Sequence, residues 1–149
     1  MPHRTAKEHQ RLVDILKRHE GLRLHPYEDS VGVSTIGYGR NLEDVGISKD
    51  EAALLLANDI ARAQKEAEVN IPHFECLDIV RQDVLINMIF NLGIKGFMRF
   101  RRLRLAIDCQ DWSWACHEML DSKWARQVGS RAIELAEMMR YGRYPNESE

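Results

Sequence analysis

The sequence is short of the features that mark several large classes of protein. Only three of its 149 residues are cysteines, Cys76, Cys109 and Cys116, and no two of them have the spacing of a zinc site. The six histidines show no ligand spacing either, so we expect no metal site and no cofactor. Because the thiols are odd in number and unpaired in spacing, we expect them to be reduced and mostly buried.

Long apolar runs are absent as well. No stretch approaches the ~18 residues of a membrane-spanning helix, and residues 1–21 lack the apolar core and small-residue cleavage site of a signal peptide. We therefore expect cytoplasmic synthesis and no stable membrane anchor. Repeats, Pro/Ser-rich linkers and low-complexity segments are also missing, and a chain of 149 residues suits one domain with a sizeable core.

The chain also lacks an excess of positive charge. The chain has 21 Lys and Arg against 23 Asp and Glu, which gives a net charge of −2 at pH 7. Proteins that hold nucleic acid by bulk electrostatics are usually clearly basic, so we expect no nucleic-acid partner. The one dense basic run contains Arg99, Arg101, Arg102 and Arg104. We interpret it as a solvated helix face, since Phe100 and Leu103 already account for its periodicity.

The sequence does contain clear helix signals. Thr5 and Glu8 form a capping box, and Ser48 and Glu51 form a second one. Residues 78–92 carry an apolar stripe broad enough for a central core helix that ends at Gly93. Helices are expected at 5–20, 48–70, 78–92, 97–107, 111–120 and 130–141. A frayed tail is expected over 145–149.

Between the first two helices lies a glycine-rich segment, residues 22–40. Pro26 and several glycines exclude a long helix there. Val31, Val33 and Thr35 alternate with other residues at a period of two, which indicates a short strand. The expected fold class is therefore α+β and mainly α.

The residues most suited to chemistry lie in the segment 20–40, EGLRLHPYEDSVGVSTIGYGR. Glu20 ends the first expected helix, Asp29 follows after eight intervening residues, and Thr35 follows after five more. Two carboxylates on separate elements can have different environments, so that one is protonated while the other is ionised. General acid–base cleavage of a glycosidic bond needs that difference. On composition alone, solvated turn residues would be the commoner explanation.

The motifs E-G-L-R-L, Y-x-D and S-T-I-G-Y-G, spaced Glu-x8-Asp-x5-Thr, resemble the signature of the phage-type lysozymes, the endolysin family (glycoside hydrolase family 24). The similarity covers roughly residues 12–142 and includes INMIFNLG and SKWARQVGSR further along the chain. It implies a two-lobed lysozyme-like fold in which a long helix joins the lobes. The small β-hairpin lobe would comprise about 21–60, and the helical lobe about 1–20 plus 61–149.

The resemblance also implies a reaction, hydrolysis of the β-1,4 bond between N-acetylmuramic acid and N-acetylglucosamine in bacterial peptidoglycan. Glu20 would protonate the leaving oxygen, and we expect partial burial to favour its protonated form. Asp29 would activate a water or stabilise the developing oxocarbenium ion. Thr35 would hold that water, although an ordinary strand residue is the alternative for it.

Four substrate-binding positions follow from the same resemblance: Phe90, Asn91, Trp124 and Arg131. Phe90 also suits a core position, which its periodicity slightly favours, whereas Asn91 is polar within an apolar run. Trp124 would face across the cleft, although a single tryptophan is most often buried. Arg131 is either a partner of the acid or a surface arginine, and the sequence favours neither alternative over the other.

The sequence departs from the family pattern at Arg40, where many relatives have histidine. Arginine cannot accept a hydrogen bond, so any pair that stabilises the lobe there has to be rebuilt, with Glu43 or Asp44 as the expected partner.

The expected context is that of a monomer which is made in the cytoplasm and acts on peptidoglycan after release. A holin-type protein would be needed for that release if the chain is an endolysin. Two alternatives stay open. One is a lytic transglycosylase, which uses one acid and an internal sugar hydroxyl, and against which the Asp29–Thr35 pair argues. The other is a lysozyme-like glycan-binding or scaffold protein without activity.

Overall fold

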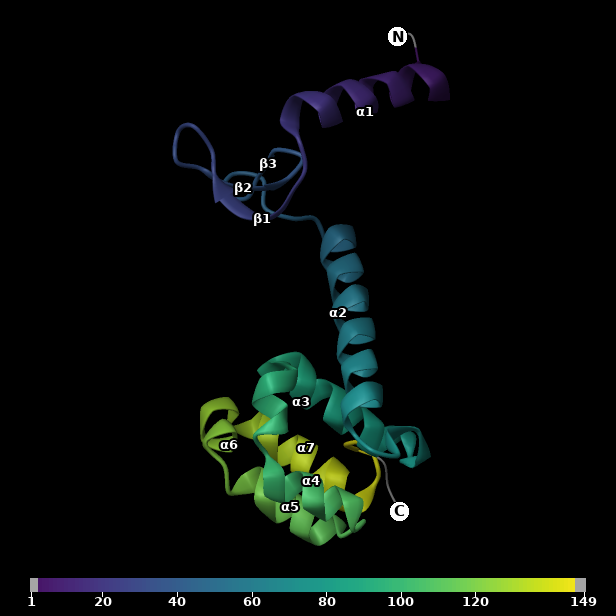
Figure 1. Ribbon diagram of the computed structural model, residues 1–149, viewed down its shortest axis with the longest axis vertical. Helices are drawn as coiled ribbons and strands as arrows, with labels where there is room; N and C mark the ends of the chain where they lie inside the picture. The colour runs from purple at the N-terminus through teal and green to yellow at the C-terminus, as the bar shows by residue number, and fades with distance from the viewer. Residues whose placement is uncertain (1–2, 147–149) are drawn as a thin grey trace. The chain divides into compact units, whose positions relative to one another are not determined.

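The computed structural model describes residues 3–146, which form seven α-helices, one short 3-10 helix and a three-stranded antiparallel sheet (Figure 1). This confirms the expected α+β, mainly α class. The chain forms two compact units, Met1–Ala53 (the N-terminal unit) and Leu54–Glu149 (the helical unit). The boundary falls inside helix α2 (Lys49–Asn70). The assignment of residues 1–20 to the helical lobe stays a prediction.

The N-terminal unit begins with helix α1 (Ala6–Glu20). The expected capping box is present, because the Glu8 amide donates to Thr5 Oγ1 at 3.2 Å while the Glu8 carboxylate accepts from the Thr5 amide at 2.8 Å. The helix ends at Gly21, whose φ of 71° leaves the helical region. These signals are local, which is why the sequence places both ends of α1 correctly.

The sheet has the strand order β1-β2-β3, with β1 at Arg23–Glu28, β2 at Ser34–Gly37 and β3 at Arg40–Asn41. Both pairings are antiparallel, as expected for consecutive strands joined by tight turns. The register sets Thr35 opposite Tyr27 and also opposite Asn41. Thr35 therefore lies on the central strand, with a neighbour on each side.

The partner expected for Arg40 is wrong. Arg40 forms an ion pair with Glu51 at 2.9 Å and also donates to the Gly46 carbonyl at 3.0 Å. Glu43 instead accepts from the Ser34 amide, and Asp44 accepts from the Asn41 side chain. The second capping box explains the change, since it turns the Glu51 carboxylate back toward Ser48 and the preceding loop.

The pKa of Glu51 is strongly lowered by its neighbours in the N-terminal unit. The hydrogen bond from Arg40, followed by those from Ser48, lowers the pKa of the Glu51 carboxyl from 4.5 to about 2. The carboxylate therefore stays ionised well below neutral pH and connects the loop after β3 to the start of α2.

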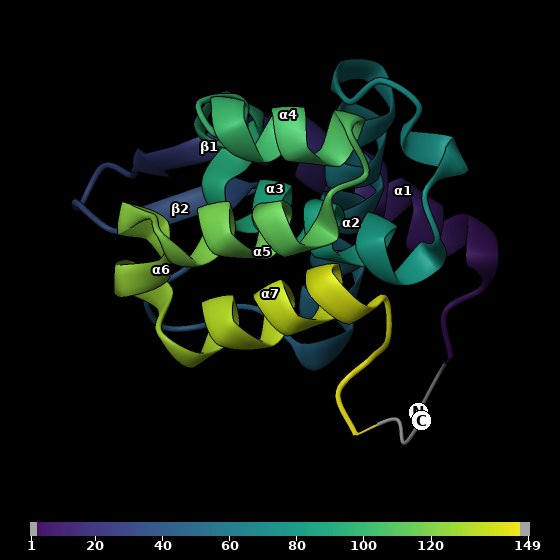
Figure 2. The same cartoon turned by 90° about the horizontal axis from the view of Figure 1, so that it is seen from below.

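The helical unit is built around α3 (Ile79–Met98). Val84, Leu85, Met88 and Ile89 are at most 1% exposed, which confirms the expected central helix. The other helices of this unit are α4 (Arg101–Asp108), α5 (Trp112–Leu120), α6 (Lys123–Val128) and α7 (Ser130–Tyr141), with the 3-10 helix η1 at Phe74–Cys76. Figure 2 shows α4, α5 and α7 side by side, with α3 behind them.

Three details of the helical unit differ from expectation. Gly93 ends the central helix as expected, with φ 73° and ψ 160°, but a further short helical stretch follows it within α3 up to Met98, and no helix was expected to begin there before residue 97. The short elements α6 and η1 lie where no helix was expected. Two of the thiols, those of Cys76 and Cys109, are exposed, so only Cys116 fits the expected burial.

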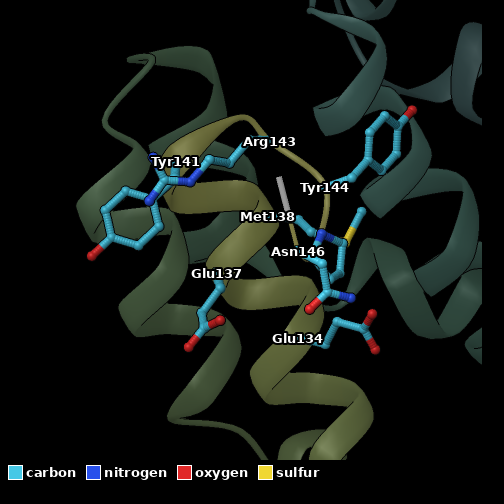
Figure 3. Close-up of a pocket in the computed structure, with 8 residues that line it drawn as sticks. Glu134, Glu137, Met138, Tyr141, Arg143, Tyr144 and Asn146 are labelled. Carbon is cyan, nitrogen blue, oxygen red and sulfur yellow. The ribbon is translucent and has the colours of Figure 1, made fainter. Parts of the chain in front are cut away.

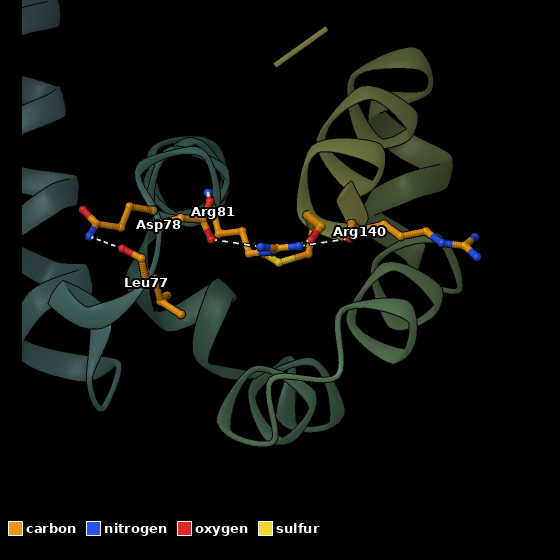
Figure 4. Close-up of polar contacts among 6 residues, drawn as sticks. Leu77, Asp78, Arg81 and Arg140 are labelled. Atoms are coloured by element: carbon orange, nitrogen blue, oxygen red, sulfur yellow. Dashed lines mark hydrogen bonds and ion pairs between the residues drawn. The ribbon is translucent and has the colours of Figure 1, made fainter. Parts of the chain in front are cut away.

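Arg81 ties the end of α7 to the start of α3 (Figure 4). Its Nε donates to the Met139 carbonyl at 2.7 Å, and a terminal nitrogen donates to the Arg140 carbonyl at 3.0 Å. The other terminal nitrogen pairs with Asp78 at 3.0 Å, and the guanidinium lies 4.2 Å from the centre of the Trp112 ring. Carbonyls in the last turn of a helix have no partner within the helix, and Arg81 supplies one for two of them.

None of the helices in the described range has the length and apolar composition needed to cross a membrane. Of the tail expected to fray, residues 147–149 lie outside the described range. Pro145 and Asn146 are described and line a pocket on α7.

Candidate active site

Glu20 is the last residue of α1 and is exposed within the N-terminal unit. The burial expected for it is therefore not provided by this unit. Two contacts hold the end of α1 against the turn between β2 and β3. The Lys17 ammonium lies 5.4 Å from the centre of the Tyr38 ring, and the Glu20 carboxylate lies against Gly39, where an added Cβ would be 2.5 Å from Oε2.

Asp29 follows β1 directly, and its carboxylate closes the loop that leads into β2. One oxygen, Oδ1, accepts hydrogen bonds from the amides of Val31 at 3.0 Å and Val33 at 2.9 Å. The Asp29 amide in turn donates to the Val33 carbonyl at 2.9 Å. Two hydrogen bonds therefore orient this carboxylate, and a third fixes the backbone that carries it.

Thr35 is 4% exposed and is the only polar residue in the buried class among residues 3–146. Its hydroxyl donates to the Val33 carbonyl at 2.8 Å, the same oxygen that accepts from the Asp29 amide. Val33 therefore links Thr35 to Asp29. Because the single hydroxyl proton is already used, Thr35 could hold a water only by accepting a hydrogen bond from it.

All three expected catalytic residues thus lie in the N-terminal unit and are arranged around β2. Thr35 is on the strand, Asp29 is in the loop before it, and Glu20 packs against the turn after it. The four expected substrate-binding residues lie in the helical unit. Within residues 3–146 no group of three or more histidine, cysteine or acidic side chains could hold a metal ion.

The helical unit contains a pocket of about 580 Å³ to which α2, α3, α7 and the C-terminal segment contribute residues. Phe90 and Arg131 line it. Phe90 is 44% exposed, so the core position that its periodicity favoured is wrong. Residue 90 lies on the outer side of α3, next to the buried Ile89.

Arg131 is held by Asn87, a residue that the sequence analysis missed. The oxygen of the Asn87 amide accepts from Arg131 Nε at 3.1 Å and from a terminal nitrogen at 2.7 Å. The sequence signal for Asn87 is a polar residue inside an apolar helix. Asn91, one helical turn later, carries the same signal. The two asparagines are four residues apart and therefore lie on one face of α3.

Trp124 has a different position from the one expected. It is 3% exposed and packs edge-on against Phe100, so its ring is not available as a stacking surface for a sugar. Its indole N–H donates to the Asn91 side-chain oxygen at 2.7 Å. Trp124 thus orients Asn91, which is itself exposed.

A second pocket of about 380 Å³ lies beside α7 and is walled by the C-terminal residues 143–146 (Figure 3). It shares four lining residues with the larger pocket, namely Glu134, Met138, Tyr144 and Pro145. The Tyr144 hydroxyl donates to the Asp83 carboxylate on α3, which holds this wall in place.

Comparison with known proteins decides the family. The sequence model described as phage lysozyme matches residues 17–140, a range that includes every residue placed above in the catalytic and substrate-binding groups. The chain belongs to the phage lysozyme family. It is therefore a glycoside hydrolase of the lysozyme type, and the family implies peptidoglycan as its substrate.

Relatives of this phage lysozyme domain come from different sources. An endolysin of Acyrthosiphon pisum secondary endosymbiont phage 1 is 31% identical, over 75% of both chains. The probable T4-type lysozyme 1 of Dictyostelium discoideum is 28% identical, over 87% of this chain and 93% of the relative. The pre-baseplate central spike protein Gp5 of Enterobacteria phage T4 is 28% identical over 83% of this chain, which is only 26% of the spike protein.

Proposed function

We propose that the protein hydrolyses the β-1,4 glycosidic bond between N-acetylmuramic acid and N-acetylglucosamine in bacterial peptidoglycan. The observation that carries the proposal is the arrangement of Glu20, Asp29 and Thr35 around β2 within one folded unit. A proton donor at a helix end and a second carboxylate fixed by backbone amides are the two groups that glycoside hydrolysis requires.

In the proposed reaction Glu20 gives its proton to the glycosidic oxygen as the bond to the anomeric carbon breaks. A water then adds to that carbon, and its proton passes to Asp29 or, after a covalent or ion-pair stage at Asp29, back to Glu20. Thr35 accepts a hydrogen bond from the water and so orients it. General acid catalysis of this kind contributes ~10²–10⁴-fold to the rate.

We assign substrate contacts to Phe90 and Asn91, which are both exposed on α3. The Phe90 ring offers an apolar face for a sugar, and the Asn91 side-chain amide keeps two N–H groups for sugar oxygens while Trp124 holds its oxygen. Arg131, which Asn87 holds at the pocket of the helical unit, is proposed as a third substrate-binding residue. Trp124 supports Asn91 and has no direct contact in this proposal.

The test is a digest of purified peptidoglycan in H₂¹⁸O, followed by mass spectrometry of the muropeptides. Hydrolysis gives reducing ends that contain one ¹⁸O atom from the solvent. Anhydro ends without ¹⁸O would identify a lytic transglycosylase, and an absence of cleavage products would support the inactive glycan-binding or scaffold alternative. The fixed Asp29–Thr35 pair favours hydrolysis, because transfer to an internal hydroxyl needs no residue to hold a water.

The proposed biological role is lysis of the bacterial cell wall by a monomer. We propose that the protein is made in the cytoplasm and, if it is an endolysin, reaches the wall after a holin-type protein permeabilises the membrane. Expression inside bacteria should then cause lysis only when the membrane is opened, for example by chloroform or a co-expressed holin. Lysis that needs no permeabilisation would contradict this part of the proposal, and a concentration-dependent mass in light scattering would contradict the monomer.

A further inference from the structure

Gly39 is the one glycine of the N-terminal unit whose missing side chain makes room for a proposed catalytic group. It lies between β2 and β3, with φ at +74°. A Cβ at this position would be 2.5 Å from Glu20 Oε2, 2.9 Å from Cδ and 3.4 Å from Cγ. Non-bonded carbon atoms pack at ~3.5–4.0 Å, so the carboxylate occupies space that any other residue would fill.

The neighbouring glycines show that this constraint is separate from backbone conformation. Gly21, Gly32 and Gly37 also have positive φ, at +71°, +82° and +70°, but an added Cβ would meet nothing within 4 Å at any of them. At those three positions the turn geometry alone accounts for glycine. At Gly39 both the φ angle and the contact with Glu20 require it.

We propose that Gly39 is a positioning residue for the acid. Its bare Cα is the surface against which the Glu20 carboxylate rests, and this contact sets the direction in which the proton is presented. The inference depends on the proposed role of Glu20 as proton donor. The Lys17–Tyr38 contact supports it independently, because it fixes the end of α1 to the same turn.

A Cβ at residue 39 would displace the Glu20 side chain rather than the backbone, because the atoms nearest to it are all side-chain atoms of Glu20. The obstructing atoms belong to the free end of a flexible side chain, so Glu20 can rotate away at little cost to the fold. To reach an ordinary contact distance the carboxylate has to shift by ~1 Å. A misplacement of that size can reduce the rate by ~10²-fold. We therefore expect Gly39→Ala to lower kcat by ~100-fold on purified peptidoglycan while KM changes little.

Gly37→Ala is the matched control. It introduces the same methyl group at nearly the same φ, only two residues away, and therefore imposes the same kind of backbone strain without reaching Glu20. Thermal unfolding should show similar shifts for the two variants, whereas kcat should fall only in Gly39→Ala. An equal loss of kcat in both would show that the turn conformation is what matters and would overturn the proposal.

Shortening the acid gives a second test, independent of how well each variant folds. In Glu20→Asp the carboxylate is withdrawn by one methylene, so a Cβ at residue 39 has less to displace. Adding Gly39→Ala to Glu20→Asp should then lower kcat by much less than the ~100-fold expected in the wild-type background. The same fold loss in both backgrounds would mean that the two positions do not interact, and the inference would be wrong.

A readout without substrate separates this inference from the proposed function. In protein labelled with ¹³C at glutamate side chains, the chemical shift of the Glu20 carboxyl carbon should change in Gly39→Ala and stay as in the wild type in Gly37→Ala. An unchanged signal in Gly39→Ala would refute the positioning role even if activity falls. If the wild type releases no muropeptides, the proposed function fails, and the carboxyl signal still decides whether Gly39 positions Glu20.

Discussion

Each of the two units of this chain is stabilised internally by a different kind of interaction. Thr35 is the only buried residue in the described part of the N-terminal unit. Order there comes from capping boxes, the Asp29 loop and the Arg40–Glu51 pair. The helical unit instead contains the whole cluster of buried apolar side chains, from Ala63 to Met139.

This difference bears on how each group of site residues is positioned. Glu20, Asp29 and Thr35 are placed by directional hydrogen bonds and by the space at Gly39, so a small chemical change can move them without removing buried contacts. The residues proposed to contact substrate, Phe90 and Asn91, lie on α3, a helix fixed by close packing, where most changes to its buried side chains create a cavity. Substitutions in the N-terminal unit should therefore affect catalysis first, and substitutions in the helical unit should affect stability first.

The largest expected effect is the loss of activity in Glu20→Gln. The amide keeps the size of the side chain but cannot donate an acidic proton, so the rate of peptidoglycan hydrolysis should fall by at least the ~10²–10⁴-fold that general acid catalysis contributes. The melting temperature should be unchanged, because Glu20 is exposed in its unit. A well-folded Glu20→Gln variant with near-normal hydrolysis would refute the assignment of the acid.

The opposite behaviour is expected of Leu85→Ala in the helical unit. Leu85 is fully buried in the centre of α3, and truncation of a buried leucine to alanine costs ~2–5 kcal/mol of unfolding free energy. Leu105→Ala on α4 is the control, since Leu105 is 54% exposed and its truncation should change the stability by less than ~0.5 kcal/mol. Denaturant unfolding measures both, and equal effects would mean that the buried cluster does not dominate the stability of this unit.

The sequence predicted the elements that depend on local signals. Both capping boxes, the end of α1 at Gly21 and the apolar stripe of α3 are each contained within a few helical turns, so residue type and spacing suffice to place them. The fold class and the family followed from the same kind of local pattern. Gly93 ends the helix as predicted, but the sequence did not predict the short helical stretch that follows it up to Met98.

The parts that could not be predicted depend on pairing between distant positions. Asn87 and Arg131 are 44 residues apart in the chain, and Trp124 and Asn91 are 33 apart, so no periodicity links them. The Arg40–Glu51 pair was missed for a related reason, because the turn after β3 brings the second capping box closer to Arg40 than the nearer acids Glu43 and Asp44. Side-chain charge predicts that Arg40 has a partner, but only the fold identifies it.

A smaller effect is expected at Trp124, which is fixed by packing and in turn positions Asn91 through a hydrogen bond. Trp124→Phe keeps most of the buried ring but removes the N–H that holds the Asn91 oxygen. A neutral hydrogen bond contributes ~1 kcal/mol, which corresponds to a ~5-fold rise in KM for peptidoglycan with kcat nearly unchanged. Asn91→Ala should raise KM to a similar extent, and adding Trp124→Phe to it should have little further effect. An additive loss in the double variant would mean that Trp124 acts independently of Asn91.

The smallest effect concerns pH and the Arg40–Glu51 pair in the N-terminal unit. Because the hydrogen bonds from Arg40 and Ser48 lower the pKa of Glu51 to about 2 in the folded state, folding favours the ionised carboxylate. The resulting stability is fully present above the unfolded value of 4.5 and is lost as the pH falls from there through about 2. The group is exposed, so the loss should be modest.

The measurement is amide hydrogen exchange in the loop between β3 and α2, compared between wild type and Glu51→Gln. Above pH 5 the wild type should be better protected than Glu51→Gln, and the difference should shrink toward pH 2 as Glu51 becomes protonated. Asp50→Asn, which removes a carboxylate from the same helical turn but leaves the pair with Arg40 in place, should keep the wild-type difference. A protection difference between wild type and Glu51→Gln that does not change from pH 5 to pH 2 would mean that ionised Glu51 does not hold this loop through Arg40, and that hydrogen bonds available to a neutral side chain are sufficient.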